Sequence, residues 1–268
     1  MTGAAVDPIV FLVRRDRALN WTGIAALVLG AWAYLLYLSR TMAGEMAGMP
    51  GMAPALAPWT ATDVAFTVLM WAVMMLGMML PAAAPVILLF TAVNRKRREQ
   101  GGLAVPTGIF VAGYLVVWGG FSVAAGLTQW ALHAAALLSP AMATTSPLLG
   151  GALLVAAGVY QLTPLKEACL AHCRSPLGFL MTEWRDGPAG ALRMRLRHGL
   201  YCLGCCWVLM GLLFVTGVMN LLWVAVIATF VLLEKVAPGG RLIGRAASWA
   251  LIAAGLVVLG QATKMAGM

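Results

Sequence analysis

The most constraining feature of this chain is a series of apolar runs, several of them close to the roughly 20 residues that a helix needs to cross a bilayer. The first run, Leu19–Leu38, is about as long as a full span and too long for the apolar part of a secretory signal peptide. Only 10% of the residues are charged, against about 25% in an ordinary soluble domain. We therefore predict an all-α fold, a polytopic transmembrane helical bundle.

Helix breakers divide the apolar runs into about seven spans within a single transmembrane domain, 1–268. Thr60 and Asp63 are expected to form a capping box at the start of the second span. Pro81 and Pro85 are expected to kink that span or to end its regular part. The predicted spans cover roughly residues 19–38, 60–90, 103–130, 147–165, 199–217, 220–235 and 242–262.

Basic residues give this bundle an orientation. With seven spans, all but two of the 18 Lys and Arg residues fall on one side, the exceptions being Arg40 and Lys264. The positive-inside rule makes the basic side cytoplasmic, so we expect the N-terminus inside and the C-terminus outside a bacterial inner (plasma) membrane. The net charge of +9 is then a topology signal for a protein in contact with lipid, and we expect no nucleic-acid partner.

Two connections in the predicted bundle are long. Residues 39–59 form an outer loop containing Met42, Met46, Met49 and Met52, and residues 166–198 form an inner loop with an interfacial segment. A mutual ion pair or an interfacial carboxylate is expected for Glu234 beside Lys235. No phosphate-binding loop, nucleophile elbow or HExxH helix is present, so we expect ligand handling rather than catalysis.

All five cysteines and two of the three histidines gather near the inner ends of the fourth and fifth spans. A reducing compartment makes structural disulfides unfavourable, and Cys and His at this spacing indicate a soft-metal site. His198, Cys202 and Cys205 share one helix face, because they stand at i, i+4 and i+7. The candidate ligands are Cys169, Cys173, Cys202, Cys205, Cys206, His172 and His198.

Other interpretations of these residues remain open. A single Cys in a membrane helix is often only a small packing residue, and adjacent Cys205 and Cys206 diverge on a helix. Sulfur ligands favour Cu(I), Zn(II) or an iron–sulfur cluster, and we favour Cu(I), with Zn(II) as the second choice.

A methionine stripe in the second span is a further candidate copper-binding feature. Met70, Met74 and Met78 stand at i, i+4 and i+8, and Met75 with Met79 forms a second pair. Among physiological metals, thioethers select Cu(I), but methionine in hydrocarbon is also an ordinary packing residue. The stripe therefore predicts either a copper path or a packed helix face.

Several motifs resemble one bacterial family. They are Tyr160–Lys166 followed by Cys169 and Cys173, then His198–Trp207, Gly217–Asn220 with Glu234-Lys235, and Met78–Pro85. Over roughly residues 60–260 they resemble the predicted metal-binding integral membrane proteins, a domain of unknown function. The resemblance implies a metal site and no established activity.

Three hypotheses follow. The first is a membrane protein that passes Cu(I) along the bundle between methionines and inner thiolates, with a metallochaperone or membrane protein as a further partner. The second is a membrane thiol-disulfide oxidoreductase that uses the same cysteines. The third is a non-catalytic subunit or assembly factor of a membrane complex.

Overall fold

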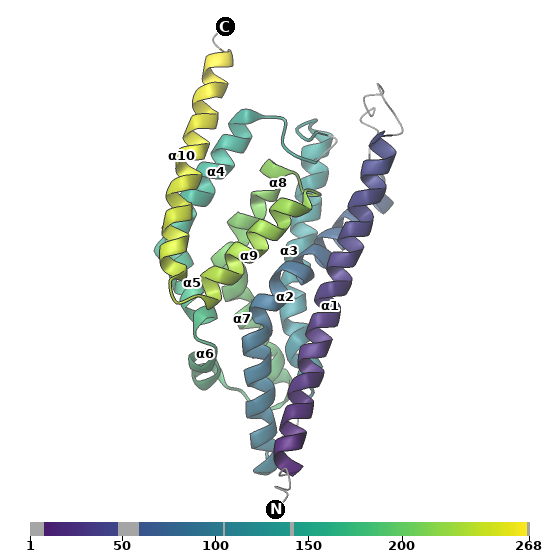
Figure 1. Cartoon of the computed structure of the whole chain (residues 1–268), viewed down its shortest axis with the longest axis vertical. Coiled ribbons are helices and arrows are strands. Elements are labelled where there is room, and N and C mark those ends of the chain that lie inside the picture. Colours follow the sequence, from purple (N-terminus) through teal and green to yellow (C-terminus); the bar gives the residue numbers. More distant parts are fainter. Residues whose placement is uncertain (1–7, 48–58, 104, 140–141, 267–268) are drawn as a thin grey trace, which may run out of the picture.

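The computed structural model describes the chain apart from residues 1–7, 48–58, 104, 140–141 and 267–268 (Figure 1). Within the described residues the fold is all-α, as predicted, with no strand and one isolated bridge between Leu138 and Thr144. The helices are α1 (Pro8–Ala47), α2 (Ala61–Glu99), α3 (Thr107–Ala134), α4 (Pro147–Gln161), α5 (Pro164–Arg174), α6 (Pro176–Glu183), α7 (Gly187–Gly211), α8 (Leu213–Thr216), α9 (Leu221–Val236) and α10 (Gly240–Ala266).

Five segments of the described chain are helices long and apolar enough to cross a membrane: 20–42, 61–99, 107–134, 187–216 and 240–264. A sixth is possible if α4 and α5, which bend by 63° at their break, count as one span. The short helix α9 has 16 residues, or about 24 Å at ~1.5 Å per residue, which is less than a bilayer core of roughly 30 Å. The N-terminal end of α1 and the C-terminal end of α10 lie at opposite ends of the molecule (Figure 1).

Helix α2 forms the centre of the core, and its local signals explain its start but not its length. The predicted capping box is confirmed: Asp63 N–H donates to Thr60 Oγ1 at 3.3 Å, and Thr60 N–H donates to an Asp63 carboxylate oxygen at 2.8 Å. The expectation that prolines would end the regular part of the helix is wrong. Pro81 and Pro85 lie inside a helix that continues to Glu99, in a segment where packing on several sides holds the backbone.

Several predicted boundaries need correction. The region 166–198, expected to be a loop, folds into α5, α6 and the first turns of α7. Helix α1 continues to Ala47, into the region expected to be an outer loop. A tight turn joins α8 to α9, with Asn220 N–H donating to the Gly217 carbonyl oxygen at 3.0 Å and Gly217 at φ +94°, a conformation that glycine adopts without strain.

Small residues let the helices around the cysteines approach closely. At Gly113 in α3, an added Cβ would lie 2.7 Å from the Leu192 carbonyl oxygen of α7, so the two backbones are almost in contact there. Helices α5, α7 and α9 contact one another, α9 packs against α2, and Met79 of α2 reaches Cys206 of α7. This meeting point holds the candidate site.

Candidate metal centre

Four thiols from two helices lie together in the core. The Cys173 thiol of α5 is within interaction distance of the Cys202 and Cys205 thiols of α7, and Cys202 also interacts with Cys206. Cys173 is 8% exposed and the three α7 cysteines are at most 2% exposed. All of these cysteines are free thiols. The structure therefore brings the two predicted half-sites together, and we call Cys173, Cys202, Cys205 and Cys206 the thiol cluster.

Local sequence signals explain why the two half-sites face each other. Thr163 caps α5 by accepting a hydrogen bond from Lys166 N–H at 3.3 Å, and Pro164 at the first helical position sets the helix direction. Helix α5 therefore begins immediately after the 63° bend and runs beside α7. On α7 the predicted helical face is confirmed, because His198 and the three α7 cysteines all point into the core.

Cys202 sits between a hydroxyl and an ammonium group. Tyr114 Oη lies 3.1 Å from Cys202 Sγ, and Lys235 Nζ donates to the same sulfur at 2.9 Å. Lys235 is 6% exposed and belongs to the last turn of α9. Neither residue is among the ligands predicted from the sequence, and both act on the sulfur rather than as metal ligands.

A second buried cation lies next to the cluster. The Arg195 guanidinium is fully buried, stacks over the Tyr114 ring at 4.3 Å and lies 3.0 Å from His198 Nδ1 through Nη1. Within the described residues, Arg195 Nε and Nη2 and His198 Nε2 are buried without a hydrogen-bond partner. Lys235 and Arg195 are thus two buried cations beside the thiols. Arg195 keeps donors without a hydrogen-bond partner, and its Nη1 contacts His198.

Two predicted ligands lie at the edge of the cluster. The Cys169 side chain is only partly buried and packs against Gly204, where an added Cβ would fall 2.8 Å from its sulfur. The His172 ring stacks on Tyr201 at 4.0 Å and its Nδ1 lies 2.9 Å from the Ala168 carbonyl oxygen. These two residues are therefore neighbours of the thiol cluster rather than members of it.

The methionine that reaches the thiols, Met79, belongs to the second predicted pair, Met75 and Met79, rather than to the stripe of Met70, Met74 and Met78. Met70, Met74 and Met78 are buried in the core, with exposures of 5%, 0% and 1%. Within the described residues it is Met79 Sδ that meets a thiol, accepting from Cys206 Sγ at 3.9 Å. Met49, Met52 and Met268 lie outside the described residues, as do the side chains of Met46 and Met265.

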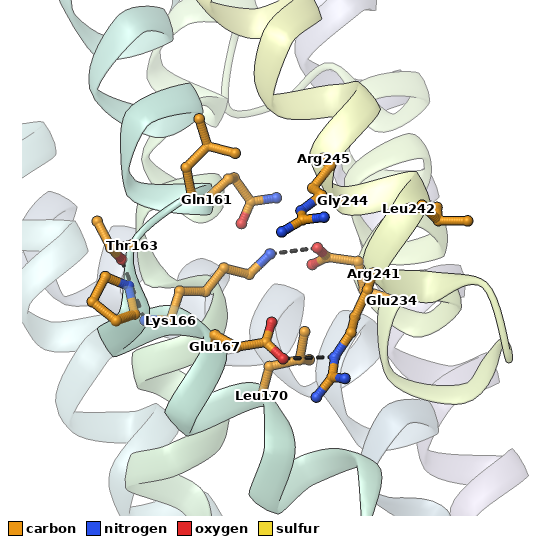
Figure 2. A pocket seen from close by; sticks show the side chains of 12 residues that line it. Gln161, Thr163, Lys166, Glu167, Leu170, Glu234, Arg241, Leu242, Gly244 and Arg245 are labelled. Atoms are coloured by element: carbon orange, nitrogen blue, oxygen red, sulfur yellow. Dashed lines mark hydrogen bonds and ion pairs between the residues drawn. The ribbon is translucent and has the colours of Figure 1, made fainter.

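The expected ion pair between Glu234 and Lys235 is wrong. Adjacent residues on a helix point about 100° apart, and here Glu234 turns away from the cluster toward Lys166, with which it forms a buried salt bridge (Figure 2). Arg174 reinforces that side by donating to the Glu234 and Ala237 carbonyl oxygens. Lys235 contacts the Cys202 thiol instead and forms no salt bridge with a carboxylate in the described part of the chain.

As placed, the described side chains include no group of three or more His, Cys, Asp or Glu residues arranged to hold a metal ion. Two of the thiols are turned toward the backbone. Cys205 and Cys206 each donate to the Cys202 carbonyl oxygen at 3.0 Å, so their hydrogens point at the backbone. A thiol is a weak donor, and deprotonation on metal binding would remove both contacts.

The sequence model of one protein family matches residues 68–258, and that family is described as PpoB2, copper chaperone. The chain belongs to the PpoB2 copper chaperone family. The matched region covers well over half of the chain and contains the thiol cluster, Met79 and Lys235. The resemblance to a metal-related family is thereby confirmed, and the description of that family names copper as the metal. No curated protein and no solved structure is significantly similar to this chain.

Proposed function

We propose that this protein is an integral membrane protein that binds Cu(I) at the thiol cluster and transfers it. The observation that carries the proposal is the burial of four thiols from two helices beside two cations. Thiolate and thioether are the ligands that select Cu(I), and Met79 adds a thioether at the edge of the cluster. The family description supports copper as the cargo.

Charge balance supports binding of the thiols as thiolates. Cu(I) carries one positive charge, so two thiolates give a site of charge −1 and three give −2. Lys235 lies 2.9 Å from one of these sulfurs, and Arg195 is buried beside Tyr114 on the same side. Burying two cations without an anion is costly, and an anionic copper–thiolate centre would offset that cost.

A route for copper along α2 is part of the proposal. Met70, Met74 and Met78, together with Met75 and Met79, lie within ten residues, a rise of roughly 13.5 Å on a helix. Met79 is at the thiol end of this series and in contact with Cys206. Weak sites in sequence suit transfer, because an ion must be able to leave each of them.

We further propose seven crossings of the bacterial inner membrane, with α9 as a short, tilted span and the N-terminus inside. Large apolar side chains are exposed along the outer helices, among them Leu29 (69%), Val257 (60%) and Trp249 (64%), which fits lipid contact. Lys166, Arg195 and Lys235 are buried in this fold and so contribute less to orientation than the exposed basic residues. The latter still lie almost entirely on one proposed side. A cytoplasmic metallochaperone could then reach the cluster from that side.

The test is copper binding by the full chain purified in detergent under reducing conditions. We expect the native protein to bind Cu(I) and Cys202→Ser to lose most of it. Cys202 is the thiol that contacts both Cys173 of the other half-site and the Lys235 ammonium group. Cys169→Ser is the matched control, since that thiol lies at the edge of the cluster. Elemental analysis gives the stoichiometry, and a thermal melt verifies that both variants are folded.

Two results would contradict the proposal. One is full copper retention by folded Cys202→Ser. The other is a native protein that binds no copper but forms a disulfide between Cys173 and an α7 cysteine in air, which would favour the thiol oxidoreductase instead.

A further inference from the structure

A cavity of about 510 Å³ lies between α4, α5, α9 and α10 (Figure 2). Its volume falls in the range of roughly 300–1,000 Å³ that small-ligand sites occupy. Glu234 lines this cavity, whereas the next residue, Lys235, contacts Cys202. No residue of the thiol cluster lines the cavity, so it is distinct from the proposed copper site.

The charges around the cavity leave one cation unpaired. Lys166 pairs with Glu234 deep in the wall, and Arg241 pairs with Glu167 at 2.6 Å nearer the surface. Arg245 also lines the cavity but makes no ion pair within the described residues. The net charge of the lining is thus +1, which matches a monoanion.

Hydrogen-bond donors point into the same part of the cavity. Figure 2 shows the Gln161 amide and the Arg245 guanidinium converging beside the Lys166 ammonium. Gln161 is only 9% exposed, and neither of its amide atoms has a hydrogen bond of ordinary length, although the amide is close enough to Glu234 to interact with it. A buried amide without a partner costs free energy, so this site favours a ligand that accepts hydrogen bonds.

We propose that this cavity binds a phosphate group. A phosphate oxygen can accept from the guanidinium and the amide together, and the phosphodiester of a phospholipid carries the single negative charge that the lining balances. In the proposed orientation, Arg241 and Arg245 lie at the cytoplasmic surface, where basic pockets between membrane helices recognise lipid headgroups. A small phosphate compound from the cytoplasm offers the same chemistry.

The experiment uses the full chain in neutral detergent with two probes, dioleoylphosphatidylglycerol and inorganic phosphate. Dioleoylglycerol, which has the same acyl chains without the phosphate, and chloride at matched ionic strength are the blanks. Native mass spectrometry detects bound lipid, and the shift in thermal midpoint measures the affinity for each probe. We expect Arg245→Gln to weaken binding about tenfold or more, because it removes a charge-assisted contact. Arg98→Gln, an exposed arginine on α2, should bind like the native protein.

Each outcome decides the proposal. Binding of the phospholipid alone identifies a lipid site, and binding of inorganic phosphate alone identifies a site for a soluble phosphate compound. The proposal is overturned if neither probe binds above its blank, or if Arg245→Gln binds either probe as tightly as the native chain. Copper binding by Arg245→Gln serves as the independent check of folding, and it would be unaffected even if the phosphate site did not exist.

Discussion

Replacing Lys235 with methionine gives a direct test of the charge balance at the thiol cluster. Lys235 Nζ donates to Cys202 Sγ at 2.9 Å and is buried, so its charge is poorly screened by water. Lys235→Met keeps a long flexible side chain and replaces the ammonium group with a neutral thioether; Lys235→Leu, which has no sulfur, is measured beside it because a thioether can itself bind Cu(I). We expect weaker Cu(I) binding, because the anionic copper–thiolate centre would lose its nearest cation.

The magnitude follows from the contact. A unit charge about 4 Å from another is worth about 4 kcal/mol at an effective dielectric constant of ~20, which is an upper limit because the lost ammonium no longer has to be desolvated. A hydrogen bond to a charged group contributes about 1.5–3 kcal/mol. At ~1.4 kcal/mol per factor of ten, the Cu(I) affinity should fall about 10- to 150-fold.

Metal-free protein should respond in the opposite sense. Replacing a buried charge with an apolar group of similar size is often neutral or stabilising, so Lys235→Met should melt at the same temperature as the native protein or higher without copper. Cu(I) affinity is measured anaerobically by competition with a chromophoric chelator. Lys235→Arg, which keeps the charge, and Lys96→Met, which removes an exposed charge, are the controls. An unchanged or tighter Cu(I) affinity in Lys235→Leu, which adds no sulfur ligand, would refute the charge argument.

Three further predictions concern topology and methionine. Reporters fused after residues 98 and 186 should be cytoplasmic and one at the C-terminus external, since the exposed basic residues lie on one proposed side; a cytoplasmic C-terminus would remove one proposed span. Met79→Leu should lower Cu(I) affinity in the chelator assay, because it removes the thioether beside Cys206, at a packing cost under about 1.5 kcal/mol. Replacing all three methionines of the stripe, Met70, Met74 and Met78, with leucine should alter copper accumulation in cells without altering protein abundance. Unchanged accumulation would mean that the stripe serves packing alone.

Local patterns in the sequence were sufficient to predict the helices and the half-sites. Apolar run lengths predicted the all-α class, and the Thr60–Asp63 pair predicted the start of α2 because a capping box depends only on neighbouring residues. The spacing of His198, Cys202 and Cys205 likewise predicted a shared buried face. Boundaries were less accurate where short polar helices, such as α5 and α6, carry no long apolar run.

The partners of the cluster could not be predicted, because they depend on which helices are neighbours. Met75 and Met79 differ from the predicted stripe by one helical position, and only the packing of α7 against α2 decides which sulfur meets Cys206. Tyr114 comes from α3 and shares no motif with the cysteines. Its role follows from the close approach of α3 and α7 at Gly113.

The positions of the two cations in the sequence indicate burial as well as membrane topology. Arg195 stands three residues before His198 and seven before Cys202, on the face that also carries the cysteines. Lys235 likewise continues the buried stripe of α9 that contains Val224 and Val231, at i+11 and i+4. A basic residue in register with an apolar face must be buried or must end the helix. In this chain both are buried, and the thiols supply the polar contacts that a carboxylate would supply in an ordinary ion pair. A cation that faces sulfur rather than carboxylate is the arrangement that a thiolate-bound monovalent metal would stabilise, and this links the charge pattern of the sequence to the copper proposed for the site.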